Sequence, residues 1–241
     1  GNRPPAATND AEPRSPPTMK LSHHHAAAGV LGPVLLALLA AGCAHTGSRS
    51  RGKLDDGLLQ FVDPIAKQEV QEARVAHMQT KDERAAAEYR VQHADSNRRV
   101  LTAEKRAAAE RVKLERERVA AMTDVETGTE ASPEAQQSLT DAARDLQAAE
   151  NRIELHEAQL EVLKAELDLA KTEEAHAAAV VDVWKARALK SLNNEQSGAI
   201  DLFAYESLER DCGTEIEIAK IRLWAAQSKV QTLEDRLADG E

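Results

Sequence analysis

The stretch from Leu139 to Ser191 reads LTDAARDLQAAENRIELHEAQLEVLKAELDLAKTEEAHAAAVVDVWKARALKS and decides the fold. Alternate steps of three and four residues from Leu139 reach sixteen positions, thirteen of them apolar. These positions are Leu139, Ala142, Leu146, Ala149, Ile153, His156, Leu160, Leu163, Leu167, Ala170, Glu174, Ala177, Val181, Trp184, Ala188 and Ser191. A seven-residue apolar repeat sustained over this length predicts a long helix that packs in a coiled coil.

Capping residues and breaks divide the chain around this seam. Asp63-Pro64 and Ser132-Pro133 each place a capping side chain before a proline, which is favoured in the first turn of a helix. The turn-like Thr127-Gly128-Thr129 separates them, which predicts an antiparallel hairpin of two helices of roughly 60 residues, folded near residue 129. A later break at Asn193-Asn194 and Ser197-Gly198 predicts a third helix that ends at about Ala238.

The two flanking helices carry apolar seams of their own. The third helix repeats apolar residues without interruption: Cys212, Ile216, Ala219, Leu223, Ala226, Val230, Leu233 and Leu237. We therefore expect Cys212 to act as a buried small hydrophobe, with pairing between subunits as the alternative. The seam of the first helix is weaker, with polar gaps at Arg84, Arg98 and Lys105; its members are Ala66, Val70, Ala73, Ala87, Val91, Ala94, Leu101, Ala108, Val112, Val119 and Met122.

These patterns predict an all-α fold, a long antiparallel coiled-coil hairpin with a shorter third helix packed on its base. The third helix reaches only partway, so the far end of the hairpin, roughly residues 107–152 and called the tip below, has two helices. Its seam is rich in alanine and buries little apolar area per residue. We expect the tip, centred on Thr127 to Pro133, to bind a partner or to oligomerise; an inert, frayed end is the alternative.

Residues 19–42 have the features of an export signal peptide. Lys20 supplies a positive start, and Val30 to Ala41 form an apolar run of about 12 residues, too short to cross a bilayer. Residues 1–18 are rich in proline and precede Met19, which suggests a disordered leader or an over-extended gene start. The adjacent histidines of residues 23–25 lie in the segment to be removed, so we do not expect them to bind metal.

The run Ala40-Ala41-Gly42-Cys43 resembles the lipobox of bacterial lipoproteins, with Ala40 in place of the usual larger aliphatic residue. The resemblance implies cleavage between Gly42 and Cys43 and a lipid anchor on Cys43, made of a thioether-linked diacylglycerol and an acylated amino terminus. Ala44 is not the aspartate that marks inner-membrane retention in such lipoproteins, so the implied location is the outer membrane, with the body in the periplasm. A chance cysteine after an uncleaved helix is the alternative.

The mature chain would then consist of two parts. Residues 43–60 comprise the lipidated Cys43 and a tether rich in glycine, serine and charge, and residues 61–241 form the coiled-coil domain. Lipid chains on Cys43 would hold this soluble domain to one leaflet of the membrane.

Composition and motifs argue against several function classes. The formal net charge of −10 disfavours nucleic-acid binding, which needs a basic surface. His77, His93, His156 and His176 lie far apart in the helical body, without the short spacing of a metal site. No phosphate-binding loop or nucleophile motif occurs. We therefore expect no enzyme activity, no catalytic or metal residues, no cofactor beyond the covalent lipid on Cys43, and no small-molecule substrate.

The chain has six aromatic residues, and four of them converge on one end of the expected hairpin. Phe61, Trp184, Phe203 and Tyr205 should lie where the three helices meet, and we expect them to form a small core there. The alternative is a surface for peptidoglycan or a partner protein.

A second resemblance is local. Residues 184–189 (WKARAL), residues 197–202 (SGAIDL) and the helix to Leu237 resemble the helical parts of outer-membrane efflux proteins and their periplasmic adaptors, over about 60 of the 241 residues. The first hypothesis is therefore a scaffold or adaptor lipoprotein of the cell envelope that binds a protein partner, or itself, through its helices. The second is an accessory component of an efflux or secretion assembly. The third is an enzyme or periplasmic chaperone with an unrecognised site.

Overall fold

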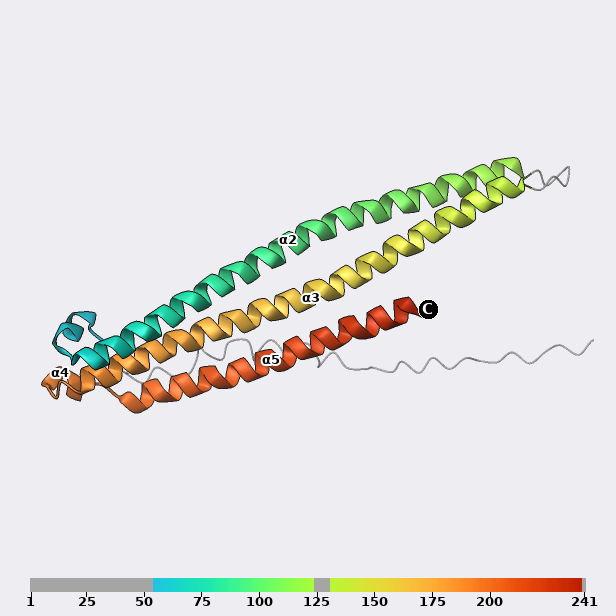
Figure 1. Ribbon diagram of the computed structural model, residues 1–241. Helices are drawn as coiled ribbons and strands as arrows, with labels where there is room; N and C mark the ends of the chain where they lie inside the picture. The colour runs from blue at the N-terminus through green and yellow to red at the C-terminus, as the bar shows by residue number, and fades with distance from the viewer. Residues whose placement is uncertain (1–53, 124–130, 240–241) are drawn as a thin grey trace, which may run out of the picture. The chain divides into compact units, whose positions relative to one another are not determined.

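A computed structural model describes residues 54–123 and 131–239 of the protein. Its elements are the 3-10 helix η2 (Asp56–Phe61) and the helices α2 (Pro64–Met122), α3 (Pro133–Lys190), α4 (Glu195–Gly198) and α5 (Leu202–Ala238). All regular structure in these residues is helical, which confirms the predicted all-α class. Helices α2 and α3 form the long antiparallel hairpin, and α5 packs beside α3 (Figure 1).

The long helices begin where capping side chains satisfy their first backbone N–H groups. The carboxylate of Asp63 accepts a hydrogen bond from the Ile65 N–H at 2.8 Å, and the Ser132 hydroxyl accepts one from the Ala135 N–H. Pro64 and Pro133 follow these caps in the first turn, as predicted. The Asp201 carboxylate caps α5 in the same way. Local capping chemistry therefore sets all three starts.

Helix α3 lies between its two long neighbours. It contacts α2 along one side and α5 along another, whereas α2 and α5 have no comparable contact with each other (Figure 1). Ala149 belongs to the seam that faces α2, and Ala158 is buried near α5; nine residues, or about two and a half helical turns, separate them. The three helices therefore form a single layer, because α3 is apolar on two opposite faces.

Side-chain size changes along this layer. At the base, a cluster contains the buried side chains of Val62, Val70, Val183, Ala186, Ala188, Leu189, Ile200 and Tyr205. Among the described residues of the tip, the buried side chains are Val112, Ala131, Ala135, Ala142 and Ala149. The large apolar side chains that stabilise most by leaving water are therefore concentrated at the base.

Ion pairs across the hairpin show the register of α2 against α3. Arg111 pairs with Asp145 at 2.7 Å and Arg84 with Glu174 at 3.0 Å. A loop centred near residue 129 predicts partners at positions 148 and 175, so the observed register agrees to within about one helical turn. Lys229 of α5 pairs with Glu161 of α3 at 2.7 Å, as expected for a fold-back near residue 195.

Two details differ from the expectations. Residues 54–60, assigned to the tether, belong to the folded body, because η2 forms there and Leu54, Leu58 and Leu59 pack against the base cluster. The four converging aromatic residues do not form one core. Tyr205 is buried and Trp184 packs against the base cluster, whereas Phe61 and Phe203 are 68% and 59% exposed. The aliphatic side chains of Val62 and Ile200 fill the base instead.

Candidate interaction surfaces

The predicted lipid site lies outside the described residues. This holds for Gly42 and Cys43, for the signal segment 19–42 and for the leader 1–18. The first described residue, Leu54, packs at the base of the hairpin, at the end opposite the tip. The segment that follows Cys43 therefore enters the helical body at the base.

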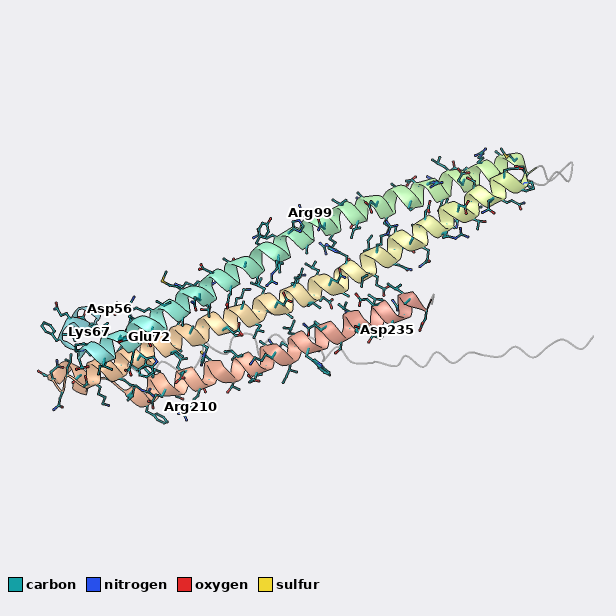
Figure 2. All side chains as sticks on the ribbon, viewed as in Figure 1. Asp56, Lys67, Glu72, Arg99, Arg210 and Asp235 are labelled. Carbon is teal, nitrogen blue, oxygen red and sulfur yellow. The ribbon has the colours of Figure 1, made fainter. Side chains whose placement is uncertain are left out.

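Helix η2 is held to the base by two ion pairs that share one carboxylate. Asp56 contacts Lys185 of α3 at 2.9 Å and Arg74 of α2 at 3.0 Å. The hydrogen bond from Lys185 is the main reason why the pKa of Asp56 lies below its ordinary value. Lys67 also donates to the backbone carbonyl of Gln60, and Figure 2 labels Asp56 and Lys67 at this end of the hairpin. Residues 54–61, called the entry segment below, are therefore fixed to both helices of the hairpin.

Two polar positions interrupt the apolar seam of α3, and both find partners on α2. His156 Nε2 lies 2.7 Å from the carbonyl oxygen of Ala94, to which it donates. Glu174 accepts from Arg84 at 3.0 Å, and this hydrogen bond is the main reason why the pKa of Arg84 is raised. Buried polar groups are tolerated when they are hydrogen-bonded, and here each fixes one position of α3 against α2. These residues align the helices.

The four histidines of the described helices lie apart from one another. His77 lies 3.9 Å from Glu174, but within the described part of the chain no three side chains of His, Cys, Asp or Glu come together as metal ligands would. His93 lies beside Tyr89 on the exposed side of α2, and His176 lies beside Gly213 of α5. The structure thus distributes the four histidines along the hairpin.

Two open grooves flank the contact between α3 and the C-terminal half of α5. One is lined mainly by charged side chains: Glu154, Glu157, Glu161, Lys229 and Arg236. The other is lined by Val162, Leu163 and Val230 with neighbouring glutamines and Glu234. Cys212, in the N-terminal half of α5, is buried as predicted, at 2% exposure. Both grooves are open along the helices, whereas small-molecule sites usually enclose most of their ligand.

The described residues contain no helix with an apolar run long enough to cross a bilayer. The chain matches no family model, no curated protein and no solved structure. The two resemblances that the sequence suggests therefore stay predictions, and the functional argument depends on the helices and their surfaces.

Proposed function

We propose that the protein is a lipid-anchored scaffold or adaptor of the bacterial outer membrane, which holds a helical body in the periplasm and binds other proteins through its helix faces. The observation that carries the proposal is the position of the entry segment. Residues 54–61 are fixed at the base, so an anchor on Cys43 would join the body at one end and leave the helix faces and the tip accessible.

The proposed activity is binding, without catalysis. The two grooves beside α5 are open, and acidic and basic side chains of the described residues form ion pairs between helices or along one helix. Such pairs fix the register of one helix against another, and exposed pairs of this kind stabilise the fold only weakly. The acidic composition supports a protein partner over a nucleic acid. We propose no cofactor other than the covalent lipid.

A second candidate is an accessory component of an efflux or secretion assembly. The tip favours it, because α5 ends near residue 154 of α3, where Arg236 pairs with Glu154. Beyond that point the hairpin has two helices and an alanine core, and another helical hairpin could pack against either face. This candidate shares the lipid anchor and differs only in the partner.

The anchor is tested by replacing each cysteine in turn in the full chain. Cys43→Ala in a Gram-negative host should abolish incorporation of labelled fatty acid and release the protein from the membrane fraction. Cys212→Ala is the matched control, because that thiol is buried between helices, and its labelling should be unchanged. Equal labelling of the Cys43→Ala variant would exclude the lipoprotein proposal.

The partner is tested by photo-cross-linking in intact envelopes. A cross-linking residue at Arg116 in the tip and another at Gln71 in the base are both exposed and do not disturb the core. An adaptor should give discrete cross-linked proteins at one or both positions. An efflux accessory should give a transport component at Arg116. If neither position yields a discrete product, a role in protein docking is wrong.

A further inference from the structure

Helix α2 has an apolar stripe on the side that packs against nothing in the described residues. Its large members are Met78, Tyr89, Val100 and Leu114, which are 65%, 68%, 58% and 63% exposed. They are 11, 11 and 14 residues apart, close to whole numbers of helical turns, so they lie along one line. The exposed alanines Ala85, Ala103 and Ala107 fall on the same line. We call these seven residues the outer stripe.

The outer stripe faces away from α3. At 100° per residue it lies roughly 140° around α2 from the buried seam that contains Ala87, Ala94 and Val112. Arg99 stands beside the stripe, with a side chain that is 80% exposed, and Figure 2 shows it on the edge of α2 away from α3. Soluble helices normally place charged and polar residues on such an edge. Four large apolar side chains there point to an unfilled interface.

The charges beside the stripe identify the occupant, and we infer that it is a second copy of the chain, with the two α2 helices antiparallel about a two-fold axis beside Asn97. In this arrangement Arg90 of each copy lies opposite Glu104 of the other, and Glu83 opposite Arg111. Arg90 and Arg111 remain 55% exposed while they pair with α3, so their guanidinium groups keep donors for a second carboxylate. Each pair occurs twice in a symmetric dimer.

The opposite flank of the stripe agrees with the same axis. There Glu88 lies opposite Arg106, and Asp95 opposite Arg99. One like pair, Lys81 with Lys113, lies near the ends of the contact, where long side chains can turn into solvent. A parallel pair of α2 helices would instead place Arg106 beside Arg111 of the other copy, which repels. Charge complementarity therefore selects the antiparallel dimer.

Side-chain sizes are complementary under this symmetry as well. Tyr89 lies over the small Ala103 and Ala107 of the second copy, and Met78 lies beside Leu114. The contact from residue 78 to residue 114 extends over about 54 Å at 1.5 Å per residue. The tip of each copy then lies beside the base half of α2 in the other. This inference does not depend on the lipid anchor.

The purified full chain with Cys43→Ala lacks the predicted lipid site, so its dimerisation can be measured independently of the anchor. Sedimentation equilibrium should show a monomer–dimer equilibrium. Tyr89→Lys should raise its dissociation constant by at least about tenfold, because it inserts a charge into the apolar line. The matched control is Trp224→Lys on α5, another aromatic side chain that is 68% exposed, which should leave dimerisation unchanged. A monomer at every soluble concentration, or loss of the dimer only with Trp224→Lys, would overturn the inference.

Cysteine cross-linking tests the symmetry. Ser96→Cys lies near the axis and should form a disulfide-linked dimer with itself. Ala85→Cys alone should not, although a mixture of Ala85→Cys and Ala107→Cys chains should cross-link. Self-linking of Ala85→Cys would show a parallel or different arrangement and exclude the proposed one. Exchanging charges in Arg90→Glu weakens the dimer, and the double variant Arg90→Glu with Glu104→Arg should recover it; no recovery would contradict the assigned pairing.

Discussion

The base and the tip are built from the same two long helices, but their interiors differ. At the base, aliphatic and aromatic side chains from η2, α2, α3 and α5 enclose Leu189, which is 1% exposed. In the tip, alanines such as Ala142, at 0% exposure, allow α2 and α3 to approach closely but bury little area. We infer that the base supplies most of the unfolding free energy, while the tip depends on close approach and ion pairs.

The largest expected effect follows from truncating the base core. Leu189→Ala should lower the free energy of unfolding by about 2–5 kcal/mol, since it leaves a cavity in the most completely buried cluster. Urea denaturation followed by helical circular dichroism measures the loss. Ile221→Ala is the control, because Ile221 is 66% exposed and should cost less than about 0.5 kcal/mol. Equal losses would show that the base does not dominate stability.

Overpacking the tip should have a smaller and local effect. Ala142→Leu places a large side chain at a seam position of α3 that is 0% exposed, and it should cost about 1–3 kcal/mol. Amide hydrogen exchange should speed up in residues 133–152 and stay unchanged in residues 176–190, because the tip can open separately. The adjacent Ala143 is exposed, so Ala143→Leu should change neither segment. Exchange that also rises at the base would refute independent opening.

Much of this architecture could be predicted from sequence because it depends on local signals. The caps at Asp63 and Ser132 and the apolar repeats determine where helices begin and which face they bury, and the structure agrees at each. Ten of the eleven seam positions of α2 are buried or half-buried, with Met122 as the exception. In helices of this length the apolar residues repeat many times, so the sequence alone is enough to locate the helix and its main buried face.

The features that sequence missed depend on two elements at once. The seam through Leu139 locates only one face of α3. The second face contains Ala158 and Ala179. Its alanines and polar residues occur both in cores and on surfaces, so the sequence does not show that this face is buried. Aromatic residues favour cores, which predicts that Phe61 and Phe203 are buried at the base, but aliphatic side chains form most of the base cluster. The sequence also assigned residues 54–60 to a tether, since the ion pairs of Asp56 join positions far apart in the chain.

The ion pairs of the hairpin give a still smaller effect. Arg84→Gln should lower the unfolding free energy by more than the control variant Arg144→Gln does, because it leaves the Glu174 carboxylate, which is 17% exposed, without its main partner. Arg144→Gln removes a pair along one helix whose arginine is 74% exposed, and should cost less than about 0.5 kcal/mol. Thermal unfolding of both variants measures how much unfolding free energy each substitution removes. If Arg84→Gln costs no more than Arg144→Gln, the polar positions of the seam do not align the helices.

The smallest expected effect concerns the ion pairs of Asp56 that hold η2 at the base, and it depends on pH. Because the folded pKa of Asp56 is lower than its ordinary value of 3.8, ionised Asp56 stabilises the fold above about pH 4, and this contribution disappears as the pH falls through the folded pKa. Asp56→Asn should therefore cost about 0.5–1 kcal/mol at pH 7, limited by the 61% exposure of the side chain, and less at pH 2.

The matched control for this pH dependence is Asp168→Asn. Asp168 is also 61% exposed, but its ion pair with Lys171 lies within α3, so the change should be near zero at both pH values. Measuring each variant against the parent chain at the same pH cancels the titration of all other carboxylates. A difference between the parent and Asp56→Asn that is as large at pH 2 as at pH 7 would mean that Asp56 stabilises the base through packing or through hydrogen bonds to neutral groups. The proposal that its charge holds η2 to α2 and α3 would then be wrong.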